Sequence, residues 1–320
     1  MFEHGFIYLV SFIGIWIGAG LAIKSVEHIS RSLRVSSFIL SFLILGFFTS
    51  VSELSVGINS IFVNNPEIYV GNLIGASLVI FLLIVPLLAV GANGLKINSG
   101  FQGFNLLFSM LVIAAPVILS MDGVVDRFDS LACLLLYCFI VFFIQMKKAI
   151  LENVDTMKKA QTLRLIKDIF KIFVGIVLIF VASKVVVTET LYFSKSLNVS
   201  VFFISLILIA VGTNIPELSI TVRSLFMKKN QIAFGDYVGS ASFNTFLFGF
   251  LTLMYGKPVN LTNSYFISLL FLISGLCLFY YFARKDQLIT RKEGLVLLLM
   301  YISFLIVELL LHPLPLMVQK

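Results

Sequence analysis

One glutamate in the middle of a long apolar run, present twice, constrains this chain more than any other feature. The first copy reads Thr-Ser-Val-Ser-Glu-Leu-Ser over residues 49–55, and the second reads Thr-Asn-Ile-Pro-Glu-Leu-Ser over residues 213–219. The two copies align without a gap from Ser30 and Ser194 to Ile80 and Asn244, with 16 identities in 51 positions. Roughly a tenth of positions would agree by chance in segments this apolar, so the alignment indicates an internal duplication.

The composition is that of a membrane protein. Of the 320 residues, 59% are hydrophobic and 12% are charged, whereas soluble domains average about 25% charged residues. Apolar runs of about 17–25 residues are long enough to cross a bilayer. We therefore predict an all-α membrane protein with ten transmembrane helices, at 6–23, 36–62, 68–91, 104–120, 131–146, 169–187, 199–226, 234–254, 264–282 and 294–311.

The predicted spans divide into two groups of five around a polar segment, 147–168. We expect a first five-helix repeat over 1–146, a short helical linker on the cytoplasmic side over 147–168, and a second five-helix repeat over 169–320. The duplicated pairs of spans cover 36–91 and 199–254. An odd number of spans per repeat inserts the two copies in opposite directions, an arrangement that recurs in secondary transporters.

The basic residues predict the orientation of these spans. If the N-terminus lies outside, the inner loops hold sixteen of the 23 Lys and Arg residues, and the outer side with its nearby span ends holds five. This positive-inside bias places both termini outside, and we expect a multi-pass protein of the plasma (inner) membrane. The basic residues are spread over separate membrane loops, so the net charge of +7 does not indicate nucleic-acid binding. The expected partners are the lipid bilayer and inorganic cations; the oligomeric state stays open, and a monomer is compatible with the sequence.

Glu53 and Glu217 lie near the middle of their predicted spans. An ionised carboxylate there costs at least a few kcal/mol unless it has a partner, a proton or a bound cation. Neither a Lys nor an Arg lies near mid-span in either segment. Antiparallel repeats would bring the two glutamates together at the centre of the bilayer, where like charges need a cation between them or must take up protons. A divalent cation would neutralise both.

Neutral oxygens surround both glutamates in the sequence. Hydroxyl and amide side chains precede each glutamate by one turn, and Pro216 removes a backbone donor and frees a carbonyl. The segments 71–77 and 235–241 follow, and their paired glycines permit close helix approach. Hard cations such as Ca2+ take six to eight oxygen ligands. The predicted metal ligands are Glu53, Glu217, Thr49, Ser50, Thr213, Asn214, Ser240, Asn244 and Ser77. Asp236, about 12 Å along a helix from Asn244, is interpreted as a charge in the vestibule and not as a ligand.

At this point the chain resembles a known family. Residues 211–217 (Val-Gly-Thr-Asn-Ile-Pro-Glu) with 235–240 (Gly-Asp-Tyr-Val-Gly-Ser) are similar to the second α-repeat of the Ca2+/cation antiporter superfamily, typified by the sodium/calcium exchangers. Residues 49–53 with 71–75 resemble the first α-repeat. The resemblance implies that both glutamates coordinate Ca2+, helped by Thr and Ser side chains and backbone carbonyls, and that spans 1 and 6 slide across a fixed bundle. The ligands carried over by the resemblance are Thr49, Ser50, Glu53, Thr213, Asn214, Glu217 and Ser240.

The first repeat departs from the family pattern at four positions. Phe48 replaces a glycine, Ser52 replaces a proline, Ala76 replaces a serine, and Ile80 replaces an asparagine or aspartate. Sodium exchangers commonly use an acidic or amide pair at the positions of Ile80 and Asn244. We therefore expect the selectivity for the counter-ion to change more than the divalent site.

These observations predict a secondary active antiporter that exchanges Ca2+ for Na+ by alternating access. Exchange of Ca2+, or of another divalent cation, for H+ is the main alternative, because two protons on the glutamates achieve the same neutrality. A non-transporting membrane scaffold is a further alternative. A channel is disfavoured, because buried carboxylates trap cations. The spans carry no nucleophile–base constellation, so we expect neither an enzyme nor a resident cofactor; the cations are cargo.

Overall fold

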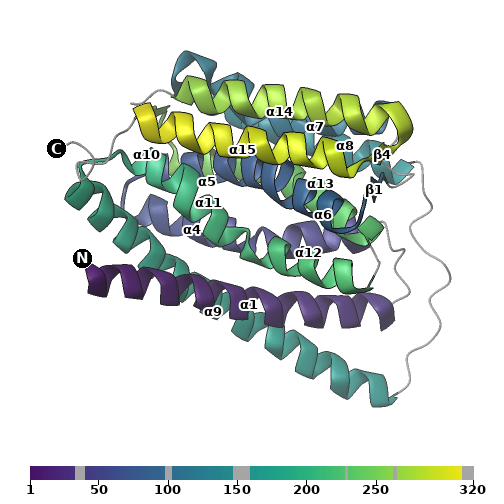
Figure 1. Ribbon diagram of the computed structural model, residues 1–320. Helices are drawn as coiled ribbons and strands as arrows, with labels where there is room; N and C mark the ends of the chain where they lie inside the picture. The colour runs from purple at the N-terminus through teal and green to yellow at the C-terminus, as the bar shows by residue number, and fades with distance from the viewer. Residues whose placement is uncertain (33–39, 98–102, 147–158, 228–229, 262–264, 312–320) are drawn as a thin grey trace.

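The computed structural model describes residues 1–32, 40–97, 103–146, 159–227, 230–261 and 265–311. Most of these residues form helices that run roughly along one direction (Figure 1). Three π-helical segments, η1, η2 and η5, interrupt them, and η4 is a 3₁₀ turn. In chain order the helical elements are α1 (Phe2–Ser32), η1 (Leu40–Leu45), α3 (Gly46–Thr49), α4 (Val51–Phe62), α5 (Glu67–Leu78), η2 (Val79–Ile84), α6 (Val85–Gly91), α7 (Phe104–Leu119), η4 (Ser120–Asp122), α8 (Arg127–Met146), α9 (Lys159–Leu197), α10 (Val201–Ile204), η5 (Ser205–Ile209), α11 (Ala210–Thr213), α12 (Ile215–Met227), α13 (Asn230–Tyr255), α14 (Tyr265–Asp286) and α15 (Arg291–Leu311).

The 164-residue offset of the duplication extends over nearly all of these elements. It superimposes the bounds of α3 on those of α11, and it relates η1 to η5 and α8 to α15 within one residue. Four short strands follow the same rule. β1 (Leu95–Lys96) pairs with β4 (Leu288–Ile289), and β2 (Val124–Val125) pairs with β3 (Val259–Asn260), both antiparallel. Each two-stranded sheet therefore joins the two halves of the chain, and the structural repeat is longer than the segment in which sequence identity reveals it.

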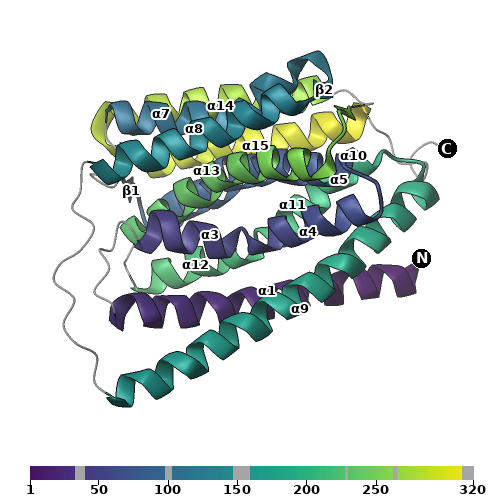
Figure 2. The ribbon, with the colours of Figure 1, turned by 180° about the vertical axis from the view of Figure 1, so that it is seen from behind.

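Corresponding helices run in opposite directions. The segment from η1 through α4 runs antiparallel to the segment from α10 through α12, and α1 runs antiparallel to α9 (Figures 1 and 2). α1 and α9 pack along each other and lie on one side of the bundle. α1 begins and α15 ends at the same end of the molecule, as expected if the N-terminus and the end of α15 lie on one side of a membrane.

Within the described residues, eight helices are long and apolar enough to cross a membrane. A ninth candidate is the pair Phe42–Thr49 and Val51–Phe62, which is bent by 41°. α8, which contains the predicted span 131–146, is a 20-residue helix but is not among these candidates. The C-terminal part of the expected helical linker, residues 159–168, forms the start of α9, which continues without interruption into the sixth predicted span. Residues 147–158, with several of the inner-loop lysines, lie outside the described part.

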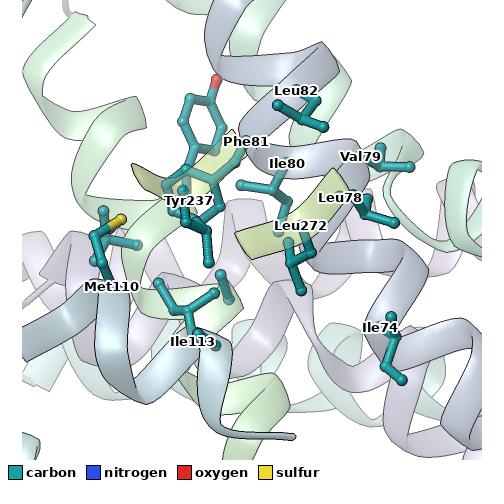
Figure 3. Close-up of a cluster of buried hydrophobic side chains, with 14 of the residues drawn as sticks. Ile74, Leu78, Val79, Ile80, Phe81, Leu82, Met110, Ile113, Tyr237 and Leu272 are labelled. Carbon is teal, nitrogen blue, oxygen red and sulfur yellow. The ribbon is translucent and has the colours of Figure 1, made fainter. Parts of the chain in front are cut away.

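The centre of the bundle is formed by the two spans that carry the duplicated glycine segments, 71–77 and 235–241. In the most apolar 18-residue stretch of each span, 83% of the residues are buried within Glu67–Gly91 and 78% within Phe234–Tyr255. The corresponding share is 28% within Arg291–Leu311. An apolar cluster packs around η2, where Ile80 lies among Phe81, Ile113 and Tyr237 (Figure 3). Inside a membrane such packing holds helices together through close van der Waals contact. It also explains why the position of Ile80 carries no polar side chain.

Candidate cation-binding site

Two helix breaks at equivalent positions create the site. α3 ends at Thr49, Ser50 leaves helical geometry with ψ of 5°, and α4 begins at Val51. In the second half α11 ends at Thr213, Asn214 has ψ of 10°, and α12 begins next. Each break follows a π-helix, a segment type that is frequent at functional sites. Broken helices of this kind place polar backbone and side-chain groups at mid-membrane depth, where they line a site.

Pro216 fits the second break because the first turn of a helix does not need its N–H group. In the first half Ser52 takes the place of this proline and fills the break differently. Its hydroxyl group lies 2.9 Å from the carbonyl oxygen of Thr49, 3.2 Å from that of Thr213 and 3.0 Å from Oε2 of Glu53. The departure at Ser52 therefore adds a hydroxyl that contacts the glutamate and both halves of the site.

Paired glycines bring the second set of helices against the breaks, as predicted. A Cβ atom on Gly75 would overlap the carbonyl oxygen of Leu206, and one on Gly239 would overlap that of Phe42. These two contacts are equivalent under the 164-residue offset. Close approach at both glycines lets α5 and α13 present their polar side chains to the breaks.

Glu53 is fully buried and lies where the halves meet. Its Oε2 atom accepts a hydrogen bond from Ser52, and its Oε1 atom lies 3.4 Å from Nδ2 of Asn214 in the other repeat. Nδ2 of Asn214 also donates to the carbonyl oxygen of Ala210 at 2.7 Å. The stronger bond of that amide is thus to its own helix, and Glu53 receives only a long contact from it.

Glu217 is equally buried and has fewer partners. Its Oε1 atom accepts a hydrogen bond from Ser240 Oγ at 3.1 Å, while Oε2 has no partner. Ser240 Oγ lies 3.0 Å from Ser50 Oγ, so α13 links the second glutamate to the break of the first repeat. Both glutamates therefore contact side chains of the two helix breaks, Glu53 through Asn214 and Glu217 through Ser240 and Ser50.

Two equivalent side-chain pairs cross between the repeats. Thr213 Oγ1 donates to Oδ1 of Asn72 at 3.1 Å, and Thr49 Oγ1 lies 3.4 Å from Oδ1 of Asp236. Asp236 is fully buried, so its interpretation as a vestibule charge is wrong. The distance along the helix to Asn244 was the wrong measure, because the site approaches Asp236 across the helix, from Thr49. Neither Asn72 nor Asp236 was predicted as a ligand, although their alignment with each other in the duplicated segment was visible.

The remaining predicted ligands lie farther along the same helices. Asn244 is buried, and neither its Nδ2 nor its Oδ1 atom has a hydrogen-bond partner. Ser77 is buried and donates to the carbonyl oxygen of Leu73 in its own helix at 3.4 Å. The hydrogen bonds thus gather seven of the nine predicted residues around the two breaks, namely Glu53, Glu217, Thr49, Ser50, Thr213, Asn214 and Ser240. Their role as ligands stays a prediction.

Among the described residues, neither a Lys nor an Arg pairs with an acid of the site. Ion pairs in the described part of the chain join His4 to Glu189, and His28 and Lys171 to Asp168; none of these reaches Glu53, Glu217 or Asp236. Several buried polar atoms there have no partner: Asn72 Nδ2, Asn214 Oδ1, Glu217 Oε2 and Asp236 Oδ2. Each such atom costs about 1–3 kcal/mol, and an ion is one of the ordinary explanations for them.

The donor set fits a hard cation. Within the described part of the chain, no three His, Cys, Asp or Glu side chains could by themselves hold a metal ion. A cation at this site would therefore share the carboxylates with hydroxyl, amide and carbonyl oxygens. Such mixed oxygen ligation suits Ca2+ and other hard cations and disfavours soft metals.

A sequence model of the sodium/calcium exchanger protein family matches residues 4–146 and 168–310. The chain belongs to this family. The resemblance predicted from the duplicated motifs is thereby confirmed, and the chain is that of a membrane exchanger with several membrane-spanning helices. The sodium/calcium exchanger MaX1 of Methanosarcina acetivorans is 32% identical over 142 residues, which cover 44% of this chain and 40% of MaX1.

Solved structures of two exchangers have the same fold. The sodium-calcium exchanger NCX_Mj, soaked with 10 mM Na+ and zero Ca2+, matches with a TM-score of 0.70 and 21% identity, over 95% of this chain and 98% of that one. The H+/Ca2+ exchanger CAX matches with a TM-score of 0.80 and 16% identity, over 95% of this chain and 82% of that one. The fold is therefore common to exchangers with different counter-ions.

Proposed function

We propose that this protein exchanges Ca2+ for a monovalent cation across the membrane, at a single site between Glu53 and Glu217. The observation that carries the proposal is that these two fully buried glutamates lie at two equivalent helix breaks and have no Lys or Arg partner among the described residues. A divalent cation between them cancels both charges. With Na+ as counter-ion this is a sodium/calcium exchanger, and the family membership favours Na+.

The proposed topology is ten spans in two inverted five-helix repeats. The equivalence of α8 and α15 supports a span at α8, since α15 meets the criterion for a membrane span and α8 has nearly the same bounds after the offset. The basic residues favour both termini outside and a location in the plasma (inner) membrane.

The orientation can be tested by labelling in a background in which Cys133, Cys138 and Cys277 are replaced by Ser. A cysteine introduced at Met157 should react with an impermeant maleimide only from the cytoplasm. One introduced at Asp122, next to the strand β2, should react only from outside. The opposite pattern at both positions would reverse the orientation without affecting the inverted repeat.

Electrostatics would enforce exchange rather than leak. An empty site carries uncompensated charge, and moving that charge past an apolar surface is costly. A site that holds one Ca2+ between two ionised glutamates is neutral, so it can move past the apolar surface at lower cost. The antiporter resemblance assigns this movement to the first and sixth spans, which are α1 and α9 here. The two helices are tied at both ends, by His4 with Glu189 and by His28 with Asp168, so they are suited to move as a pair.

A groove between α1 and α12 offers an access route. Its volume is about 360 Å3, and it extends from Lys24 and Glu27 to Pro216, the residue before Glu217. Trp16 of α1 donates a hydrogen bond to Ser219 of α12 at 2.6 Å beside it. Sliding of α1 along α12 would break this bond and change how far the groove reaches toward the glutamate.

H+ is the alternative counter-ion. The replacement of a polar ligand by Ile80, which lies fully buried in the apolar cluster, removes one oxygen that a sodium site would use. The fold matches both CAX, an H+/Ca2+ exchanger, and NCX_Mj, a sodium-calcium exchanger. The match is therefore compatible with either counter-ion. A non-transporting scaffold is the less favoured alternative. It would bear the free-energy cost of burying the carboxylates and gain no cation binding in return.

Ca2+ uptake into inverted vesicles, with an imposed Na+ gradient and then an H+ gradient, tests the proposal. Wild type should accumulate Ca2+ with one of the two gradients, and Glu53→Gln and Glu217→Gln should not. Glu308→Gln is the matched control, because Glu308 is a buried glutamate on α15 that accepts a hydrogen bond from Ser268 at 2.7 Å. Uptake by the two site variants at the control rate would refute the proposal.

A further inference from the structure

A pocket between the end of α1 and the start of α9 has no function in the proposed exchange. Its volume is about 410 Å3, which lies within the range of about 300–1,000 Å3 that small-molecule sites occupy. The residues that line it are Leu21, Lys24, Ser25 and His28 of α1 and Lys167, Asp168 and Lys171 of α9. The pocket therefore belongs to the two helices that pack along each other on one side of the bundle.

The path of these two helices explains why the pocket is there. They cross closely at two glycines: a Cβ atom on Gly18 would overlap the carbonyl oxygen of Gly175, and one on Gly175 would overlap that of Gly18. From this crossing α9 diverges from α1 toward its own N-terminus (Figures 1 and 2). The helices therefore leave space between them beyond the crossing, and polar side chains line that space.

The charge around the pocket is mainly positive. Asp168 is 8% exposed, and its carboxylate lies 2.6 Å from Nδ1 of His28 and 3.9 Å from Nζ of Lys171. Among the described residues, neither Lys24 nor Lys167 has an acidic partner. Three lysines thus surround one aspartate, which already has partners of its own, so the pocket attracts anions.

A buried hydroxyl group in the pocket has no partner either. Ser25 is 3% exposed and lines the pocket, and its side chain makes no hydrogen bond with another described residue. Buried polar side chains are normally hydrogen-bonded, and a serine hydroxyl can donate to a phosphate oxygen. The pocket thus combines a neutral donor with ammonium groups, a combination that suits an anion with several oxygens.

The depth of the pocket in the membrane favours a lipid over a free anion. Its residues lie in the last turns of the candidate span Phe2–Ile29 and in the first turns of Leu165–Leu197, where a span meets the headgroup region. Beside them on α9, the side chains of Ile169, Phe170 and Phe173 are 59%, 65% and 64% exposed. An acyl chain can pack against this apolar surface while its phosphate group reaches the lysines.

We propose that this pocket binds the headgroup phosphate of an anionic phospholipid. The three lysines attract its charge, and the hydroxyl group of Ser25 donates to one of its oxygens. Basic pockets between transmembrane helices on the cytoplasmic side bind acidic lipid headgroups in membrane proteins, and the basic loops of this chain favour the cytoplasm for this end of α1 and α9. The inference goes beyond the proposed function and does not depend on it, because its ligand is not an exchanged cation.

Native mass spectrometry of the purified full-length protein, which counts the lipids that stay bound, tests the proposal. With phosphatidylglycerol as the probe, wild type should retain one lipid at least about tenfold more tightly than phosphatidylcholine, whose headgroup has no net charge. An excess of inorganic phosphate should not displace it. Equal retention of the two lipids would overturn the inference. Displacement by inorganic phosphate would do so too, and would identify the pocket as a site for the free anion.

A double substitution in the pocket shows whether the retained lipid is bound there. Lys24→Gln with Lys167→Gln removes the two lysines without an acidic partner and leaves the contacts of Asp168 intact. It should weaken phosphatidylglycerol binding by about tenfold or more, because each lysine near the membrane surface adds to the attraction for anionic lipids. Lys184→Gln with Lys195→Gln is the matched control, since it removes the same charge from exposed positions elsewhere on α9. The control should change binding by less than about threefold.

Replacing the same two pocket lysines by arginine separates loss of charge from loss of structure. Lys24→Arg with Lys167→Arg keeps both positive charges, so this variant should bind phosphatidylglycerol within about threefold of wild type. Unchanged binding by the glutamine variant would overturn the inference, and so would equal weakening by the glutamine variant and its control. Weakening by the arginine variant as large as that by the glutamine variant would likewise show that charge in the pocket does not hold the lipid.

Discussion

The two repeats share a backbone but differ in what they bring to the site. Their helix breaks, the π-helices η1 and η5, and the glycine crossings occur at equivalent positions, whereas η2 has no counterpart in α13. Their polar side chains do not match: along α13 lie Asp236, Ser240 and Asn244, whereas the equivalent positions of α5 and η2 hold Asn72, Ala76 and Ile80. The two repeats thus have the same backbone geometry where helices pack closely. They differ in the side chains at the equivalent positions near the site.

The divergence is greatest at Ile80 and Asn244. Ile80 lies in the π-helix η2 and packs into the apolar cluster (Figure 3), whereas Asn244 lies in the uninterrupted α13 and leaves both amide atoms without a partner. At this position the first repeat thus contributes apolar packing, and the second repeat contributes an unpartnered amide. Polar side chains that could bind a cation beside the two glutamates are therefore concentrated on α13.

The largest expected effect concerns the feature that the repeats share. Glu53→Gln and Glu217→Gln should each lower Ca2+ uptake by more than about a hundredfold, because a neutral side chain removes both the Coulomb attraction and a carboxylate ligand. The effects should be similar despite the asymmetry around the two residues. A variant that retains a tenth of wild-type uptake would mean that one repeat binds Ca2+ without the other.

The glycine crossings should matter for stability equally in both halves. Gly75→Ala and Gly239→Ala place a Cβ against a backbone carbonyl oxygen, and overpacking of this kind costs about 1–3 kcal/mol or more. Gly20→Ala is the control, since a Cβ there meets no atom within 4 Å. Thermal unfolding in detergent should show a clear fall in midpoint for both crossing variants and none for Gly20→Ala; equal midpoints for all three would contradict the close approach.

A smaller, one-sided effect is expected at the serine of α13. Ser240→Ala removes the hydrogen bond to Glu217 and the contact with Ser50, so Ca2+ affinity should fall by about tenfold. The reciprocal Ala76→Ser adds a hydroxyl to the first repeat and should change Ca2+ affinity by less than about threefold. Initial uptake rates over a range of Ca2+ concentrations measure both, and equal losses would remove the proposed asymmetry.

The smallest expected change in Ca2+ transport comes from restoring the symmetry. Ile80→Asn with Asn244→Asp should steepen the dependence of Ca2+ flux on Na+, because each substitution adds a ligand or a charge for monovalent cations. Ile80→Asn also buries an amide in the apolar cluster and should lower stability by about 1–3 kcal/mol. A wild-type flux that already depends steeply on Na+ and ignores a pH gradient would show that this account of the two positions is wrong.

The sequence predicted the parts of the site that follow from the duplication. Alignment of the two copies identified Glu53 and Glu217, and the spacing of the paired glycines predicted the close crossings that the structure has at Gly75 and Gly239. These features depend on the local sequence pattern and on the inverted repeat, and both can be recognised in the sequence alone.

The missed residues depend on contacts between helices. Asp236 and Asn72 each meet a threonine of the opposite repeat, more than 140 positions away along the chain, and no spacing rule within one helix gives that contact. Ser52 was noted only as the loss of a proline, because its hydroxyl gains partners only when Thr213 lies across from it. The continuity of the helical segment 159–168 with the sixth span was not predicted, because a polar segment of mixed charge can form either a separate linker or the end of a long helix.

The central claim is that the two halves form one Ca2+ site, and its most direct test is the stoichiometry of Ca2+ binding. Equilibrium binding of radioactive Ca2+ to purified protein should give one ion per chain. Either Glu53→Gln or Glu217→Gln alone should abolish that binding, because each glutamate supplies half of the charge. Two ions per chain, with one lost in each single variant, would contradict the account and indicate two separate sites.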